Sequence, residues 1–304
     1  MTAPDSSWLA PLAGGGIDRA AQERPEAGLL DRLRADSTSR VLVVVGDAAP
    51  LSSPEALHWV APETVPEGAE WAFLGRDAAG AGLLLAAFAE AGERSVDAPA
   101  GWGSLRAVGG ALPESDASAF VAALSLGRWL LDGRFCAACG GLLMLGDAGW
   151  SRRCPACGRQ HFPRTDPAVI VAIRSSHDPD RLLLGSNAMW GANRFSCFAG
   201  FAEAGESLEA AVQREIAEES GVDVAAVQYR GSQAWPYPRS LMVGFLATAV
   251  DDDAARPDGE EIVAVRWFTR AEIGAALAGE SDVVLPGRAS IAHRLIADWH
   301  AGAA

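Results

Sequence analysis

The chain contains no lysine, since all 25 of its basic residues are arginine. This absence excludes lysine-dependent phosphate loops, Schiff-base chemistry and lysine nucleophiles. The sequence also has no long apolar run: its longest, residues 78–89, falls short of the roughly 20 residues that cross a bilayer. The N-terminus carries Asp5 and no basic leader ahead of its apolar part, so no secretory signal is evident. We therefore expect a cytoplasmic protein with no membrane segment.

Negative charge exceeds positive charge, with a formal net charge of −14. This balance argues against a broad basic surface that neutralises many nucleic-acid phosphates, but it is compatible with a pocket for one terminal nucleotide. A length of 304 residues and a hydrophobic share of 49% provide enough material for two or three globular domains.

Four of the five cysteines form two CxxC pairs, Cys136 with Cys139 and Cys154 with Cys157. Each pair is followed by glycine, which favours the tight knuckle that turns backbone N–H groups toward sulfur. Two such knuckles predict a closed tetrahedral Zn²⁺ site of structural type in a reducing compartment, one ion per chain. The alternative is a redox pair, which typically occurs singly beside a βαβ unit. Cys197 is predicted to be a small buried apolar residue.

Local patterns predict short strands, then a helix from Ser115 with Asp116 as its cap, and then a second group of strands and helices. Strands on both sides of a helix within 200–222, with helices covering the sheet, indicate an α+β chain that contains a mixed-sheet α/β/α sandwich. The expected strands are 41–45, 56–60, 71–75, 83–87, 168–173, 181–184, 224–229, 241–250 and 262–268. The other expected helices are 28–34, 270–277 and 290–300.

The helix within 200–222 carries acids on its apolar side. At about 100° per residue, Glu215, Glu218 and Glu219 overlap the stripe formed by the apolar residues of this helix. A desolvated carboxylate is costly unless it is paired or bound to metal, and converging carboxylates suit a hard divalent cation. Arg214, one turn before Glu218, is placed to hold it. The alternative is a solvated charged helix with Arg–Glu pairs.

The spacing of this segment resembles the Nudix box at each defining position: Gly200, Glu206, then Arg214-Glu215-Ile216-Ala217-Glu218-Glu219-Ser220-Gly221-Val222. The resemblance implies a hydrolase that uses Mg²⁺ or Mn²⁺ to split a nucleoside-linked diphosphate. It makes Glu215 and Glu219 direct metal ligands and Glu218 a further ligand or a water-positioning group. It adds the backbone carbonyl of Ala199 as a neutral ligand and Glu261 as an acid from outside the box.

A proline-rich segment follows the box: Ser232-Gln233-Ala234-Trp235-Pro236-Tyr237-Pro238-Arg239-Ser240. Its two prolines predict a stiff, extended loop from which Trp235 and Tyr237 project as flat surfaces for an aromatic base. The alternative is a loop packed into the fold. The segment resembles the SQPWPFPxS signature of NADH pyrophosphatases, the Nudix branch that also removes NAD caps from RNA. Ala234 replaces the family's proline, and Tyr237 replaces its phenylalanine.

This second resemblance extends from the four cysteines to the last helix. It implies hydrolysis of NAD(H) to NMN(H) and AMP, removal of NAD caps from RNA 5′ ends, and a homodimer. It implies that residues 233–240 contact the substrate, that Phe162 and Phe201 enclose the nicotinamide end, and that Ala292 gives a backbone contact. The family has tyrosine at Phe162 and glutamate at Gly149, so two polar contacts are expected to be lost.

We therefore expect a mostly-β N-terminal α+β domain in residues 1–133, a zinc ribbon in 134–163 and a Nudix domain in 164–304. Two alternatives stay open. One is a broader pyrophosphatase for ADP-ribose, dinucleoside polyphosphates or nucleotide sugars. The other is a zinc-ribbon regulatory module that senses a nucleotide through its Nudix domain, against which the complete set of carboxylates weighs.

Overall fold

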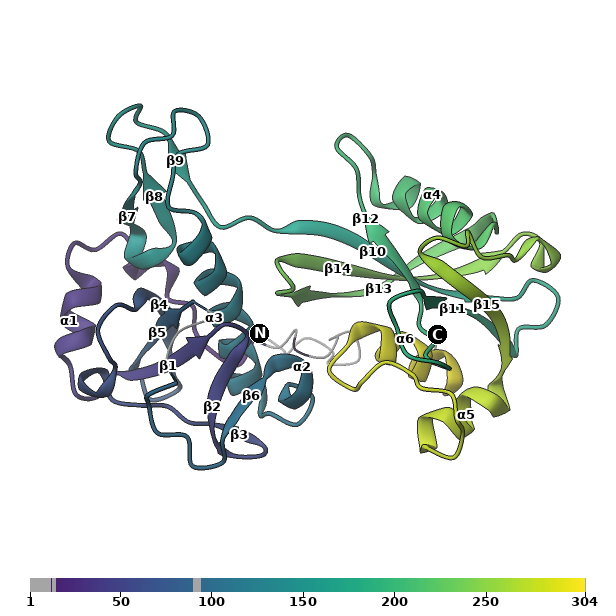
Figure 1. The fold of residues 1–304 in the computed structure, drawn as a ribbon, viewed down its shortest axis with the longest axis horizontal. Helices are drawn as coiled ribbons and strands as arrows, with labels where there is room; N and C mark the ends of the chain where they lie inside the picture. The colour runs from purple at the N-terminus through teal and green to yellow at the C-terminus, as the bar shows by residue number, and fades with distance from the viewer. Residues whose placement is uncertain (1–11, 13–14, 90–93, 304) are drawn as a thin grey trace, which may run out of the picture. The chain divides into compact units, whose positions relative to one another are not determined.

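The computed structural model describes residues 12, 15–89 and 94–303 of the chain. The chain divides into two compact units (Figure 1). The N-terminal unit comprises Gly14–Thr165 and the short segment Pro236–Arg239, and the C-terminal unit contains Asp166–Trp235 and Ser240–Ala304. None of the helices in these described ranges is long and apolar enough to cross a membrane.

A mixed sheet forms the centre of the N-terminal unit, as the β-rich pattern predicted. The strand order is β3-β2-β1-β5-β4, with β6 joined to β2, and β1 pairs in parallel with β5. The β-branched run of β1 is buried along almost its whole length, as expected of a central strand covered on both faces. The strands are β1 (Arg40–Val45), β2 (Ala48–Ser53), β3 (Ala56–Leu57), β4 (Glu70–Arg76), β5 (Gly82–Phe88) and β6 (Trp102–Ser104).

Helices cover both faces of this sheet. At Gly127, α3 comes so close to β5 that an added Cβ would lie 3.1 Å from the Cβ of Ala87. Leu29 and Leu33 of α1 pack with the alternate β5 residues, which point to the other face. The helices are α1 (Leu29–Ala35), α2 (Leu105–Val108) and α3 (Glu114–Asp132), with 3₁₀ turns at Ala21–Glu23 (η2) and Pro62–Thr64 (η3).

The predicted capping role of Asp116 is wrong. α3 begins at Glu114, so Asp116 lies inside its first turn. Its carboxylate accepts hydrogen bonds from the backbone N–H of Leu57 at 2.9 Å and from the indole N–H of Trp59 at 3.1 Å. Asp116 therefore fastens the helix to β3 and to the segment that follows it.

The cysteine-containing segment forms a small three-stranded sheet within the N-terminal unit. Its strands are β7 (Met144–Gly146), β8 (Ser151–Arg153) and β9 (Gln160–His161), with a 3₁₀ turn η4 (Asp147–Gly149) between the first two. Beside η4, the indole N–H of Trp150 donates to the carbonyl of Phe73 on β4 at 2.6 Å. The ribbon is thus hydrogen-bonded to the N-terminal sheet.

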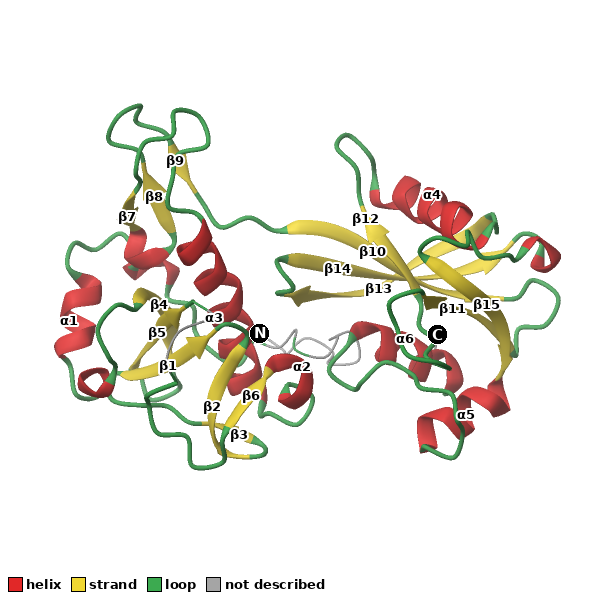
Figure 2. Ribbon diagram, viewed as in Figure 1, coloured by secondary structure: helices red, strands yellow, loops and turns green. Residues whose placement is uncertain are grey.

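The C-terminal unit is the predicted α/β/α sandwich, with a mixed sheet of order β13-β14-β10-β11-β15 and β12 paired to β10 (Figure 2). β10 and β14 are parallel, whereas the other pairs are antiparallel. The strands are β10 (Asp166–Arg174), β11 (Arg181–Asn187), β12 (Phe198–Phe201), β13 (Val224–Trp235), β14 (Ser240–Ala249) and β15 (Ile262–Thr269). The helices are α4 (Leu208–Ser220), α5 (Arg270–Ala278) and α6 (Ile291–His300), with a 3₁₀ turn η5 at Asp252–Ala254.

Alternation along β10 explains why this sheet is covered on both faces. Val169 and Val171 belong to the apolar cluster that includes α4, whereas Ile170 and Ala172 belong to the cluster that includes α5 and α6. Successive strand residues point to opposite faces, so a continuous apolar run such as this requires helices on both sides.

The predicted extended loop at 232–240 is partly wrong. Residues 232–235 are the end of β13 and pair with β14 up to Trp235 opposite Ser240. Pro236 and Pro238 lie in the turn beyond the last paired residue, with a cis Tyr237–Pro238 bond. Because the ladder has ended before the first proline, neither proline removes a donor from it.

Candidate active site

Of the three clustered acids of α4, Glu215 and Glu219 are largely buried, whereas Glu218 is exposed. The side-chain oxygen of Ser207 caps its first turn by accepting from Ala210 N–H, and Gly221 ends it with a left-handed φ of 68°. The residues of α4 that are buried are Ala211, Val212, Ile216, Glu219 and Ser220. Glu219 therefore lies on the apolar stripe, as predicted from the helical period.

Glu219 is the most buried of these acids, with an exposed fraction of 6%. Burial, followed by the negative charges of Glu261 and Glu215, raises the pKa of Glu219 to about 8, against which the backbone N–H of Ala199 acts. Its Oε2 atom is buried and has no hydrogen-bond partner among the described residues. A buried carboxylate oxygen without a donor is costly unless a cation reaches it.

Glu215 lies against the strand that precedes the helix. Its side chain is 14% exposed, and its carboxylate packs so closely on Gly200 of β12 that a Cβ there would lie 2.0 Å from Glu215 Cδ. The glycine that opens the predicted box is therefore needed for the carboxylate of Glu215 to reach this position.

Arg214 connects the acids of the segment. Its guanidinium lies 2.9 Å from Glu215, 3.1 Å from Glu218 and 2.8 Å from Glu206, and it also donates to the carbonyl of Phe201 at 2.9 Å. The predicted Arg214–Glu218 contact is confirmed. Glu218, however, is 60% exposed and lies at the edge of the buried stripe rather than within it.

Glu206 orders the loop before α4. Its carboxylate accepts from Arg214 and, at 3.0 Å, from the backbone N–H of Glu203. These hydrogen bonds, led by those from Arg214, hold the pKa of Glu206 below its usual range. Glu206 therefore closes the loop onto the helix.

Glu261 comes from the residue just before β15, and two residues that the sequence analysis did not single out hold it. The carboxylate of Asp258 accepts the backbone N–H of Glu261 at 2.9 Å, and the side-chain amide of Asn187 donates to Glu261 Oε1 at 3.2 Å. Neither residue lies in a recognisable motif. The sequence offers only the proximity of Asp258 to Glu261 as a signal.

The tail of β13 brings three predicted substrate residues to different environments. Gln233 is 1% exposed, and its amide donates to the carbonyl of Ala289 and accepts from Ile291 N–H, both at 2.8 Å. It thus fixes the start of α6 and leaves no surface for a substrate. Ala234 and Trp235 are partly exposed at the end of the strand, whereas Ser240, opposite Trp235, is buried.

The turn residues Pro236–Arg239 belong to the N-terminal unit. There the guanidinium of Arg106 lies 3.9 Å from the centroid of the Tyr237 ring, and the Tyr237 hydroxyl accepts from Arg106 N–H at 3.2 Å. A second guanidinium, of Arg128, lies 5.4 Å from the same ring. Burial raises the pKa of this phenol. The Tyr237 ring is therefore in contact with two arginine side chains, although it was predicted to offer a free surface for base stacking. Pro238 and Arg239 are exposed.

Two of the remaining predicted residues are available at the surface and one is not. Phe162, after β9 in the N-terminal unit, and Phe201, at the end of β12 in the C-terminal unit, are each more than half exposed. Ala292 is buried in the first turn of α6. Its buried side chain leaves the predicted contact to its backbone, and N–H groups in the first turn of a helix have no partner within the helix.

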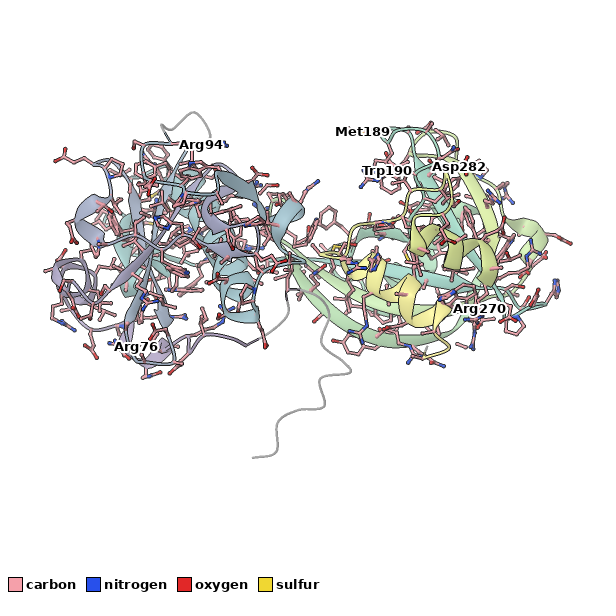
Figure 3. All side chains as sticks on the ribbon, turned by 90° about the horizontal axis from the view of Figure 1, so that it is seen from below. Arg76, Arg94, Met189, Trp190, Arg270 and Asp282 are labelled. Carbon is pink, nitrogen blue, oxygen red and sulfur yellow. The ribbon has the colours of Figure 1, made fainter. Side chains whose placement is uncertain are left out.

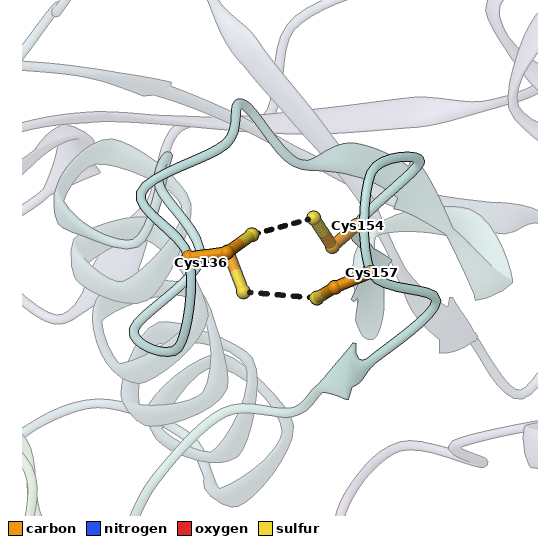
Figure 4. Close-up of side chains that lie close together, drawn as sticks. Cys136, Cys154 and Cys157 are labelled. Carbon is orange, nitrogen blue, oxygen red and sulfur yellow. Dashed lines mark hydrogen bonds between the residues drawn. The ribbon is translucent and has the colours of Figure 1, made fainter.

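The four cysteines converge as predicted (Figure 4). Their sulfur atoms all lie within 4.8 Å of one another, with Cys136–Cys157 at 3.7 Å and Cys139–Cys154 at 3.5 Å. Ligands at 2.3 Å in a tetrahedron stand about 3.8 Å apart, so this spacing fits zinc. Backbone N–H groups, first that of Ala138, lower the pKa of the Cys136 thiol to about 6. Thiolates of this kind are the form that binds metal.

Two further sequence expectations are confirmed around this site. The glycines that follow the two pairs, Gly140 and Gly158, have φ values of 72° and 74° and close the knuckles by donating to Cys136 O and Cys154 O. Cys197 is buried in the core of the C-terminal unit, where burial raises its pKa to about 12.

Gly149 cannot carry a side chain in this fold. Its φ is 99°, and an added Cβ would lie 2.4 Å from the Cβ of Ala72 on β4. The close packing of η4 on the N-terminal sheet therefore excludes the glutamate that the family resemblance would have placed there.

Comparison with known proteins gives two domain matches. Residues 164–286 match the NUDIX domain, and residues 133–162 match the NADH pyrophosphatase zinc ribbon domain. The NAD-capped RNA hydrolase NudC of Mycobacterium tuberculosis (strain H37Rv) is 40% identical over 293 residues, which cover 94% of this chain and 90% of that protein. The human NAD-capped RNA hydrolase NUDT12 is 39% identical over 199 residues, covering 62% of this chain and 42% of that protein.

Among solved structures, the crystal structure of a NUDIX hydrolase from Nitrosomonas europaea aligns with a TM-score of 0.39 and 25% identity. The alignment covers 56% of this chain and 93% of that one. The two domain matches and the 40% identity across nearly the full length of both chains agree. The chain belongs to the zinc-ribbon family of Nudix hydrolases that comprises the NADH pyrophosphatases and NAD-capped RNA hydrolases.

Proposed function

We propose that this chain hydrolyses the diphosphate of NAD(H) to NMN(H) and AMP, and that it removes NAD caps from RNA 5′ ends by cutting the same bond. The observation that carries this proposal is the burial of Glu219 beside Glu215 and Glu261, with one carboxylate oxygen lacking a partner in the described chain. The names of the relatives, NAD-capped RNA hydrolases, support the substrate class.

We infer that Glu215, Glu218, Glu219, Glu261 and the carbonyl of Ala199 hold the catalytic Mg²⁺ or Mn²⁺. Carboxylate oxygens in a cluster of like charges suit such hard cations. The buried Oε2 of Glu219 has no hydrogen-bond donor beside it among the described residues, so it is available to bind an ion. When bound, these cations would neutralise charge that develops on the diphosphate oxygens and lower the pKa of the attacking water.

The residues of the chain then have separate tasks. Arg214 restrains Glu215 and Glu218 through ion pairs at 2.9 and 3.1 Å, which preserves the geometry of the cluster. Glu218, Glu219 or Glu261 accepts the proton of the water. Glu206 keeps the loop before α4 closed.

For the organic part of the substrate, we propose Trp235 as a stacking surface for an aromatic ring. For Phe201 and Phe162, contact with the nicotinamide end is a proposal from the family resemblance alone. Phe162 and Phe201 are each more than half exposed, and Trp235 is partly exposed; aromatic rings of this kind can stack on a base. Gln233 supports the site indirectly, by fixing the start of α6. For Pro236–Ser240, contact with substrate stays a proposal from the family resemblance, as does the backbone contact of Ala292.

The zinc is proposed to be structural, because four cysteine ligands leave no open position for a water.

From the family resemblance and the apolar share of the sequence, we further propose that the protein acts as a homodimer in the cytoplasm. Light scattering on the zinc-loaded protein tests whether it is a dimer, and fluorescence imaging of a tagged chain tests whether it is cytoplasmic.

The function is tested by mass spectrometry of products from NADH and from an NAD-capped RNA oligonucleotide. Reactions contain Mg²⁺, Mn²⁺ or no added divalent cation. We expect NMNH and AMP from NADH, and NMN with a 5′-monophosphate RNA from the capped oligonucleotide, only when a divalent cation is added. Products that show cleavage of a bond other than the diphosphate, or turnover without a divalent cation, would contradict the proposal. ADP-ribose and a dinucleoside polyphosphate, run in parallel, measure how selective the enzyme is.

A further inference from the structure

The segment after β11 forms a tight turn beside Glu261. The turn is Asn187–Trp190, closed by a hydrogen bond from Trp190 N–H to the carbonyl of Asn187 at 3.0 Å. The side-chain Oδ1 of Asn187 accepts the N–H of Met189 at 2.9 Å, as in an Asx turn. Met189 is 93% exposed, and Figure 3 shows it with Trp190 at the surface of the C-terminal unit. The turn is therefore not part of the core.

The main chain of Glu261 is held on both sides. Its N–H donates to Asp258 Oδ1 at 2.9 Å, and its carbonyl accepts from the N–H of Ala188 at 2.8 Å. The same Asp258 oxygen accepts the N–H groups of Glu260 and Ile262. The ladder between β11 and β15 shifts register at Ser186/Asn187, a bulge-type irregularity that re-aims side chains.

With its backbone fixed, Glu261 retains freedom only in its side-chain torsions, and Asn187 restrains these. The Nδ2 of Asn187 donates to Glu261 Oε1 at 3.2 Å, whereas Glu261 Oε2 has no partner in the described part of the chain. The orientation of the amide is unambiguous, because Met189 N–H needs an acceptor and the carboxylate needs a donor.

We propose that Asn187 is a positioning residue for the hydrolysis, which holds Glu261 Oε1 so that Oε2 faces the acidic cluster of α4. The proposal rests on the proposed function, in which Glu261 is a metal ligand. An amide suits this position because it accepts from the turn and donates to the carboxylate at the same time. Residues that orient metal-binding carboxylates in this way usually contribute about 10- to 100-fold to metal affinity or activity.

Two substitutions separate this role from the shape of the turn. Asn187→Ala removes both hydrogen bonds. Asn187→Ser keeps an oxygen that can accept from the turn, as serine does in ST turns, but it is too short to reach Glu261. The matched control is Asn193→Gly in the same loop. Asn193 also donates to a carboxylate, Asp282 at 2.9 Å, and its φ of 57° suits glycine.

The primary readout is binding of Mn²⁺ to the full-length zinc-loaded protein, followed by electron paramagnetic resonance of free Mn²⁺. The second is the Mn²⁺ concentration that gives half-maximal AMP release from NADH. We expect both Asn187 variants to weaken Mn²⁺ binding about 10-fold, with the KM for NADH at saturating Mn²⁺ and the melting temperature unchanged. Asn193→Gly should bind Mn²⁺ like the wild type.

Wild-type Mn²⁺ affinity in Asn187→Ser would overturn the inference, and so would an equal loss in Asn193→Gly. The proposed function fails differently: the wild type would then release no AMP, or Glu219→Gln would bind Mn²⁺ as the wild type does. The two failures are therefore distinguishable in one set of titrations.

Discussion

The carboxylate of Glu215 occupies the space above Gly200 in which any other residue would place its Cβ. The built Cβ would lie 2.0 Å from Glu215 Cδ and 2.2 Å from each carboxylate oxygen, distances that no side chain can accept. Gly200, the first glycine of the box, and Glu215 therefore form one steric unit, although fourteen residues lie between them.

Gly200→Ala should displace Glu215 and disable the site while the sheet still forms. We expect a loss of roughly 100-fold or more in kcat/KM for NADH, because small displacements of catalytic groups have effects of this size. AMP release measured by chromatography checks this. Gly287→Ala is the matched control, since its Cβ meets no atom within 4 Å. Near-normal activity of Gly200→Ala would contradict the steric argument.

The raised pKa of Glu219 makes the stability of the metal-free active site depend on pH. A carboxyl whose pKa is about 8 in the folded chain and 4.5 ordinarily binds more protons when folded, so stability decreases as pH rises between these values. Even one unit of this shift corresponds to about 1.4 kcal/mol. Glu219→Gln should remove this dependence and also abolish turnover.

Thermal melting of the zinc-loaded protein without Mg²⁺ or Mn²⁺, at pH 5.5 and pH 8.5, measures the effect. Between these pH values the melting temperature of the wild type should fall by roughly 2–4 °C more than that of Glu219→Gln. Adding Mn²⁺ at pH 8.5 should raise the melting temperature of the wild type again and leave that of the variant unchanged. Equal pH slopes for the two proteins would show that Glu219 is ionised throughout.

Helical periodicity predicted the arrangement of α4 because one short-range rule decides it. Glu219 lies on the same face as Ile216 and Val212, and the structure buries all three. The cysteine knuckles were predictable for a similar reason, since each is a local turn with glycine at a fixed place. Glu218 was misplaced because it lies at the edge of the buried stripe, where packing rather than period decides exposure.

The partners of Glu261 were not predictable, because they depend on long-range pairing. Asn187 lies 74 residues from Glu261, and only the register of β11 on β15 brings them together. Gln233 was assigned to the substrate because its motif is contiguous. Alternation along β13 nevertheless turns its amide inward, toward the start of α6.

Loss of the zinc should disorder the ribbon and loosen the sheet strand to which it is bonded. We expect Cys154→Ser to lose the single zinc and to increase amide hydrogen exchange in β4, because Trp150 ties the ribbon to Phe73. Metal analysis and exchange mass spectrometry measure the two effects. Cys197→Ala, which changes a buried cysteine outside the cluster, should keep its zinc. Retention of zinc by Cys154→Ser would contradict a four-cysteine site.

Asp252 should stabilise the C-terminal unit in a pH-dependent way. Its carboxylate is buried and accepts from the Ser175 hydroxyl and from the Ser176 N–H at 3.0 Å. Burial alone would raise its pKa, but these hydrogen bonds outweigh burial and hold the pKa below the ordinary 3.8. For a carboxyl with a depressed pKa, the stabilisation is complete above the ordinary value and is lost as pH falls through the folded one.

Asp252→Asn should therefore lower the free energy of unfolding by about 1–3 kcal/mol at pH 6, and the difference from the wild type should shrink as pH falls below 3.8. Urea unfolding from pH 6 to pH 3 measures both. The control is Asp253→Asn, at the exposed neighbouring residue. It changes the net charge by the same amount as Asp252→Asn, and any loss of zinc in acid affects both variants alike. A difference in unfolding free energy that stays constant down to pH 3 would mean that the stabilisation by Asp252 does not depend on the ionisation of its carboxyl group.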